Sequence, residues 1–372
     1  MRMKIITLAL ASSVGTITSG AFAADTSSNV TIYGIADAGL VHESGGARGS
    51  INKLTNGANS MSRLGFRGSE NLGGGLSAIF GLEAGIKIDT GELDAAGVLF
   101  NRFAFVGLKS TGYGTLTLGR QYTPYYTTLF TMADPFGTSL AGNVKNLLPI
   151  GGLASRTSNM VLYVSPVTNG ASVELAYTPG EQAGSAGAGR QLGLALVYQQ
   201  GPLHVRFAYS NRNNDVAALA ATATTPAVAG VNRGLATNAI LAGNYDFGFL
   251  KAFLAYEVDH GEGSGTLPNA NAYGGVAPTP STDARDIVIG FTAPFGPGKL
   301  IASHVRKDDR TRYHQDAHQW GVGYQYPLSA RTLLYTSYAM ISNKNGAGYT
   351  VGNGGEVGSG DRGFNLGVRH VF

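Results

Sequence analysis

The sequence contains no cysteine, and only 13% of its 372 residues are charged. Without cysteine, the chain can form neither a disulfide framework nor a cysteine-based zinc site. The formal net charge of +4 is small for this length, so composition offers no electrostatic case for nucleic-acid binding. No stretch approaches 18 uninterrupted apolar residues, which excludes a transmembrane helix. Glycine is abundant, with 55 copies, but it shows no triplet period, so a collagen-like structure is excluded as well.

The N-terminal segment has the features of a secretory signal peptide. Two basic residues, Arg2 and Lys4, precede an apolar run at residues 5–11, and Ala-Phe-Ala at 21–23 supplies the small residues of a cleavage site. A buried N-terminal helix is the alternative, but the charged start and a Ser-Gly pair before the cleavage site argue against it. We therefore expect residues 1–23 to be removed during export.

Apolar and polar residues alternate along most of the remaining chain. Between residues 76 and 87, every even position is apolar, whereas the odd positions carry Ser77, Glu83, Lys87, two glycines and a single exception, Ile79. Successive side chains of a β-strand point to opposite faces, so this pattern predicts strands with one apolar and one polar face. The same alternation recurs at 172–177, 203–210, 286–292 and 364–372.

The spacing of these segments favours a membrane barrel over a soluble β-sandwich. The sixteen strand-like segments lie near residues 29–42, 60–70, 75–88, 99–110, 114–121, 158–166, 170–178, 190–200, 202–210, 236–245, 249–258, 284–293, 298–307, 316–326, 331–341 and 361–372. Connections between them alternate between short turns and long loops, whereas a sandwich would mix its loop lengths. We therefore predict one all-β domain over 24–372, a 16-stranded antiparallel transmembrane β-barrel with short periplasmic turns and long extracellular loops. The Ala/Thr-rich run 217–231 and the Gly/Pro-rich run 261–280 fall where long loops are expected, so neither marks a domain boundary.

Several motifs resemble the general porins of Gram-negative bacteria, particularly the trimeric porins of beta-proteobacteria. Residues 29–39 resemble the first strand of that family, and residues 62–76 resemble its second strand and first turn. Residues 114–121 are similar to a further strand, and residues 326–332 resemble a family turn, with departures at positions 327 and 330. The final residue, Phe372, is similar to the terminal aromatic residue that the barrel assembly machinery recognises.

A barrel of about sixteen strands leaves an aqueous channel, so some segment must narrow it. The longest connection is 122–157, and the resemblance implies that this third loop folds inward as the pore constriction. Its Asp-Pro-Phe-Gly sequence at 134–137 is similar to the tip of the family's loop. Because Asp134 is the loop's single acidic residue, we expect it to form the acidic side of the constriction.

Arginines are expected opposite that loop. Arg63, Arg102 and Arg156 match the arginines that similar porins place at the narrowest point. Arg67 shares the polar face of Arg63 but should lie nearer the turn. Arg120 matches a further such arginine, yet it has the same alternation parity as two leucines, so either a bulge intervenes or those leucines do not face lipid.

Acidic residues on the lumen face should offset part of this positive charge. They include Asp37, Glu83 and Glu174. A lumen-facing arginine could simply be a solvated wall residue, but several clustered beside a constricting loop favour a role in selectivity. The sequence thus predicts a weakly anion-selective general diffusion porin for small hydrophilic solutes and ions.

Other functions have less support in the sequence. A channel selective for a sugar or a small organic anion is the alternative, but the predicted lumen faces lack rows of aromatic residues. The seven histidines lie outside any catalytic or metal-binding motif, so we expect no enzyme activity, no cofactor and no metal site. An adhesive barrel would have no need for a constriction loop.

The resemblance also implies partners. It suggests a homotrimer in the bacterial outer membrane, with the early strands and the last strand near the subunit interface. Outer-membrane lipid and lipopolysaccharide would surround the barrel, and the assembly machinery would recognise Phe372. No nucleic-acid partner is expected.

Overall fold

The computed structural model describes residues 29–149, 155–222, 224, 226–266, 268–269, 272–274 and 277–372. The predicted signal peptide at 1–23 lies outside these residues. Within them the strands are β1 (Asn29–Ser44), β2 (Ile51–Asn56), β3 (Arg63–Gly73), β4 (Leu76–Gly85), β5 (Phe103–Ser110), β6 (Gly114–Tyr122), β7 (Arg156–Val164), β8 (Ala171–Thr178), β9 (Gln191–Gln200), β10 (Leu203–Asn213), β11 (Leu235–Asp246), β12 (Lys251–His260), β13 (Asp283–Phe295), β14 (Gly298–Asp309), β15 (Ala317–Pro327), β16 (Thr332–Asn343) and β17 (Arg362–Val371).

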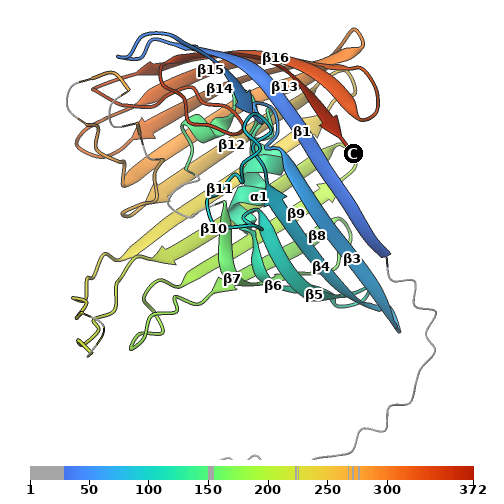
Figure 1. The fold of residues 1–372 in the computed structure, drawn as a ribbon, viewed down its shortest axis with the longest axis vertical. Coiled ribbons are helices and arrows are strands. Elements are labelled where there is room, and N and C mark those ends of the chain that lie inside the picture. Colours follow the sequence, from blue (N-terminus) through green and yellow to red (C-terminus); the bar gives the residue numbers. More distant parts are fainter. Residues whose placement is uncertain are drawn as a thin grey trace, which may run out of the picture.

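The strands form one closed antiparallel barrel (Figure 1). Apart from β2 and β3, consecutive strands pair along the chain, and β17 pairs with β1 from Ile35↔Val371 to Ser44↔Arg362. The backbone of Phe372 extends this seam, because its N–H and C=O groups bond to Gly34 at 3.1 and 3.0 Å. Within the described residues this seam closes the barrel wall, as a membrane requires.

Seventeen described strands occupy sixteen positions, because β2 and β3 share one side of β1. The first half of β1 pairs with β3, and its second half pairs with β2. The 16-stranded barrel is confirmed, but the alternation does not predict β2, which lies within the segment 43–59 expected to be a loop. Its six residues alternate too briefly to stand out from the loop around them.

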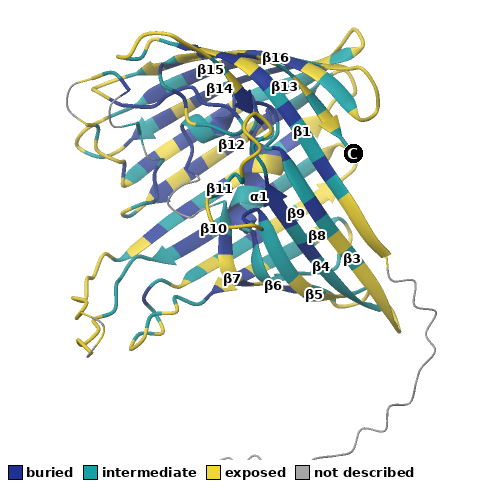
Figure 2. Ribbon diagram, in the orientation of Figure 1, coloured by how far each residue is buried: buried dark blue, intermediate teal, exposed yellow. Residues whose placement is uncertain are grey.

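Burial alternates along the strands as the period-two pattern predicts (Figure 2). In β12, Leu254 and Tyr256 are exposed on the outer surface, whereas Ala255, Glu257 and Asp259 are buried on the inner side. Exposed apolar side chains outside and polar ones inside are typical of a barrel with lipid around it and water within it. Among the described residues, every helix is too short or too polar to span a bilayer.

The third long loop runs inside the barrel (Figure 1). It contains α1 (Pro124–Thr128), the π-helical turn η1 (Leu129–Ala133) and the 3₁₀ turn η2 (Val144–Asn146). Thr123 caps α1 by accepting the Tyr126 N–H at 3.1 Å. Pro124 occupies the first turn, where a missing N–H costs nothing.

Apolar packing holds this loop against the inner wall. The helical turns contact β8 to β12, and buried Tyr125, Leu129 and Met132 belong to the same cluster as Ile240 of β11 and Val288 of β13. Farther along, Phe136 and Leu140 pack with residues from β1, β14 and β16. Close approach also requires glycine, because a Cβ on Gly321 of β15 would lie 2.6 Å from the Cα of Gly142. The hydrophobic core of this barrel is therefore the interface between loop and wall.

Candidate functional site

Two cavities of about 430 and 450 Å³ lie in the lumen, and the same side chains border both. The first is lined largely by the long loops around residues 266–269 and 349–357. The second reaches toward the short turns, past Ile35 and Arg369. Residues that line both cavities mark the neck between them, and these are Met61, Arg102, Tyr126, Lys145, Arg156 and Gly354. We call these six residues the neck.

A cluster of arginines converges on one side of this neck. Arg102 Nε lies 2.5 Å from Glu83 Oε1, and Arg63 Nη1 lies 3.7 Å from the same oxygen. The Tyr122 hydroxyl oxygen accepts hydrogen bonds from Arg102 Nη2 at 2.9 Å and from Arg156 Nη2 at 2.7 Å. The Arg156 guanidinium also lies 4.4 Å from the centre of the Tyr122 ring, within cation–π range.

Strand register explains why these residues meet. Arg63 begins β3 opposite Gly85 of β4, and Tyr122 ends β6 opposite Arg156 of β7. Arg102 directly precedes β5, so all three arginines lie at the same height of the wall. The structure thus brings together Arg63, Arg102 and Arg156, as the sequence suggested.

Lys145 completes the basic neck, at a place that no motif of the sequence predicted. It belongs to η2, and its Nζ donates to the Gly354 carbonyl at 2.9 Å. Burial, together with the nearby positive charges of Arg156 and Arg102, lowers the pKa of Lys145 to about 8, although Asp134 acts in the opposite direction. The sequence did contain a signal for this position, because Lys145 is the one basic residue between positions 123 and 155.

Asp134 differs from its predicted place. Its side chain is only 3% exposed and accepts backbone N–H groups from Phe136 at 2.9 Å, Thr138 at 2.7 Å and Val144 at 3.1 Å. Burial raises the pKa of Asp134 to about 6, despite these donors. An aspartate before a tight turn often bonds its own following backbone, and that preference holds Asp134 inside the loop rather than at the lumen.

The acidic residues of the wall face inward as predicted, but they are buried by partners. Glu83 is 3% exposed, accepts the Tyr33 hydroxyl at 2.9 Å and pairs with the arginines. Asp37 is 1% exposed and accepts the Tyr335 hydroxyl at 2.7 Å and the Ser60 N–H at 2.8 Å. Their negative charge therefore fixes neighbouring groups instead of facing the open channel.

Arg67 and Arg120 line neither cavity, although Arg120 lies beside the cluster. The Arg67 guanidinium lies 5.3 Å from the centre of the Tyr33 ring, nearer the short-turn end. A β-bulge falls between Gly119 and Gln121, so the irregularity considered for Arg120 is present. Arg120 nevertheless pairs in register with Ala104, and its side chain bonds to the Asn101 carbonyl at 2.6 Å and to Ser158 at 3.0 Å.

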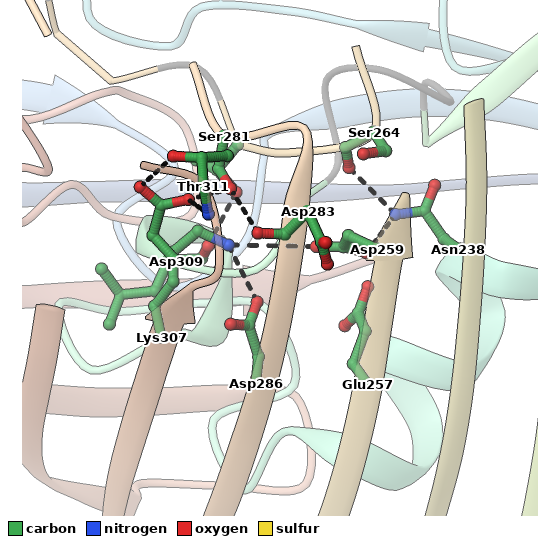
Figure 3. Close-up of polar contacts among 12 residues, drawn as sticks. Asn238, Glu257, Asp259, Ser264, Ser281, Asp283, Asp286, Lys307, Asp309 and Thr311 are labelled. Atoms are coloured by element: carbon green, nitrogen blue, oxygen red, sulfur yellow. Dashed lines mark hydrogen bonds and ion pairs between the residues drawn. The ribbon is translucent and has the colours of Figure 1, made fainter. Parts of the chain in front are cut away.

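A second charged cluster lies on the opposite wall, on β12 to β14 (Figure 3). The Tyr125 hydroxyl of α1 donates to Glu257 of β12. Lys307 of β14 lies 3.0 Å from Asp286 and 3.9 Å from Asp259, and these three side chains are at most 1% exposed. Strand alternation already places these charges on the inner face, but the path of the loop that covers them was not predictable.

Comparison with known proteins identifies the family of this chain. Residues 8–346 match the family described as Gram-negative porin. The chain is 32% identical over 361 residues to an outer membrane porin protein of Bordetella pertussis, covering 85% of this chain and 90% of that protein. It is 29% identical to outer membrane porin protein 32 of Delftia acidovorans over the full length of both.

Solved structures agree with this assignment. An anion-selective porin from Comamonas acidovorans superposes with a TM-score of 0.71 at 27% identity, covering 93% of this chain and all of that chain. A trimer form of OmpT from Vibrio cholerae shares the fold, with a TM-score of 0.63 at 17% identity over 93% of this chain and 99% of that one. The chain therefore belongs to the Gram-negative porins, the channel-forming β-barrels of the bacterial outer membrane.

Proposed function

We propose that this porin is a general diffusion channel for small hydrophilic solutes and ions, with a weak preference for anions. One observation supports the proposed preference for anions. Of the described residues that line both cavities, three are basic and none is acidic. The cavity toward the short turns adds Arg63 and Arg369 to this set, again without an acidic residue in the described lining.

The geometry gives a physical route to anion preference. Glu83 neutralises one guanidinium charge, which leaves two of the three arginines and protonated Lys145 in excess. Fixed charges of one sign in a narrow, low-dielectric neck focus the field and concentrate counter-ions. Arginine cannot lose its proton at ordinary pH, so most of this field persists across the physiological range.

A general channel fits the neck better than a substrate-selective one. Tyr126 is the one aromatic side chain among the six neck residues, and it stacks on Tyr122 at a centroid distance of 5.3 Å. A sugar-selective channel would be expected to present several aromatic faces to its solute. The similar porin from Comamonas acidovorans is anion-selective, which supports the proposed charge preference.

Single-channel recording tests this function directly. The purified protein in a planar bilayer under a KCl gradient should show discrete steps and a reversal potential that favours chloride. A potential that favours potassium would contradict the anion preference but leave the channel. Absence of any conductance from correctly folded protein would contradict the channel itself.

We further propose a homotrimer, exported after removal of residues 1–23 and assembled through recognition of Phe372. Early strands β1 to β4, together with β17, would lie near the subunit interface. The trimer form of the structurally similar OmpT supports this assembly. Conductance steps grouped in threes, and a trimer mass in mild detergent, are the expected results.

A further inference from the structure

Met61 is the methionine that borders the open lumen. Four of the chain's six methionines lie among the described residues, and Met61 alone of these four lines the two lumen cavities. It is partly exposed and belongs to the neck, in the segment between β2 and β3. The other three are shielded from channel water, because Met132 and Met160 are buried and Met340 is exposed on the outer, lipid-facing side of β16.

Hydrogen bonds to the main chain hold Met61 at this place. Arg63 Nε donates to the Met61 carbonyl oxygen at 2.9 Å. The next residue, Ser62, accepts the Asp37 N–H at 3.0 Å with its hydroxyl oxygen and donates to the Asp37 carbonyl at 3.1 Å. The backbone on both sides of this short segment is therefore fixed to the barrel wall, and the Met61 side chain keeps its position in the neck.

The thioether of Met61 faces the last long loop, between β16 and β17. A Cβ on Gly355 would lie 2.9 Å from Met61 Sδ, so the sulfur lies against the main chain of that loop. The neighbouring Gly354 donates its N–H to the Ala58 carbonyl at 3.0 Å and accepts Lys145 Nζ at 2.9 Å. The sulfur is thus beside the segment that holds one basic group of the neck.

We propose that Met61 is an oxidation site of the channel, which hypochlorous acid, a small two-electron oxidant, reaches through the lumen and converts to methionine sulfoxide. In this step an S–O bond forms and the O–Cl bond of the oxidant breaks. The thioether loses two electrons, and chloride and a proton leave. A thioether is only a weak hydrogen-bond acceptor, whereas the sulfoxide is polar, so the step changes the chemistry of the neck.

Oxidation changes the electric field of the neck without changing its formal charge. The sulfoxide oxygen carries partial negative charge, and the lining that Met61 shares contains the cationic donors Arg102, Lys145 and Arg156. We expect the chloride-to-potassium permeability ratio to fall by about twofold, less than for the loss of a full charge. This electrical effect rests on the proposed channel function, whereas the oxidation itself is measured as a peptide mass.

Peptide mass spectrometry measures the oxidation of each described methionine separately. Trypsin places the four on different peptides, with Met61 in the peptide 54–63. The full protein in phosphatidylcholine vesicles is treated with a substoichiometric dose of hypochlorous acid, and free methionine then stops the reaction. Because oxidation follows exposure, Met61 should gain one oxygen atom about tenfold faster than any of the other three.

Three variants assign the electrical effect to this side chain. The channel of Met61→Leu sets its own baseline, and its selectivity should not respond to the oxidant, because leucine has no sulfur. Met340→Leu is the matched control, and it should respond as the unchanged protein does. Met61→Gln places a polar amide at the same position and should lower the chloride preference before any oxidant is added.

Different results would overturn each part of the proposal. Oxidation that falls mainly on the other methionines would show that the lumen does not deliver the oxidant to Met61. An equal loss of chloride preference in treated Met61→Leu would assign the effect to another oxidisable group, such as the Lys145 amine. Oxidised Met61 with unchanged selectivity would contradict the electrical effect. Absence of conductance before treatment would contradict the channel function instead, and the peptide masses would still decide whether Met61 is the oxidation site.

Discussion

The two walls of the lumen carry similar charged residues, but these residues differ in their exposure to the channel. On the wall of β3 to β7, Arg63 retains 20% of its side-chain exposure beside the open neck. On the wall of β12 to β14, Lys307 and Asp286 are fully buried, in the cluster whose Glu257 accepts the Tyr125 hydroxyl of α1. The third loop makes the difference, because it covers one cluster and leaves the other open. Inward-facing charge alone therefore does not identify a selectivity site, since the path of the loop decides which charges meet water.

The largest expected effect comes from breaking the covered cluster. Lys307→Met leaves Asp286 and Asp259 buried without their cation, which costs about 3–5 kcal/mol of unfolding free energy. The matched change on the open wall, Arg156→Met, should cost less than about 1 kcal/mol, because water can solvate the groups left behind. Guanidinium unfolding followed by Trp320 fluorescence measures both. Equal losses would show that the two walls do not differ as argued.

A smaller effect is expected within the loop that separates the walls. Asp134→Ala removes the acceptor for three backbone N–H groups, and leaving a buried donor unpaired costs about 1–3 kcal/mol. The exposed carboxylate Asp89 provides the control, as Asp89→Ala. Unfolding midpoints, together with the rate of protease cleavage in the loop, check this result. If Asp134→Ala changed chloride selectivity but left stability intact, the sequence-based assignment of Asp134 to the constriction would be restored.

The barrel was predictable because the two faces of each strand meet different environments, lipid outside and water inside. The alternation of apolar and polar residues follows from this difference. That alternation also placed Arg63 and Glu83 on the inner face. It failed for Asp134 and Lys145, since residues of an irregular loop have no such period. Their positions depend on how Tyr125 and Phe136 pack against distant strands, and one sequence does not specify that packing. Local periodicity thus predicts the barrel wall, whereas the residues of the constriction can be placed only from the tertiary structure.

The open wall should govern selectivity. Arg102→Gln or Arg156→Gln removes one fixed charge from the neck, and a charge interaction of about 1 kcal/mol at about 4 Å in water corresponds to a roughly fivefold fall in the chloride-to-potassium permeability ratio. Arg67→Gln is the control, because Arg67 faces Tyr33 away from the neck. Reversal potentials in a KCl gradient measure all three. An equal fall in the Arg67 variant would mean that total lumen charge, and not the neck, sets the preference.

The smallest expected effect is a pH dependence that originates in Lys145. Its pKa is lowered to about 8, so the side chain is protonated below that pH and becomes neutral as the pH rises through it. The neck thereby loses one positive charge as the pH rises through that pKa, and the chloride preference should fall by about twofold. This effect is smaller than that of a missing arginine, because the charge of Asp134 already offsets part of the field of Lys145. In Lys145→Arg the charge persists on both sides of that pH, so the dependence should disappear with the preference kept high. In Lys145→Gln the pH dependence should also disappear, with a low chloride preference at every pH. A pH slope that survives in the arginine variant would assign the titration to another group and leave Lys145 as a hydrogen-bond donor to Gly354.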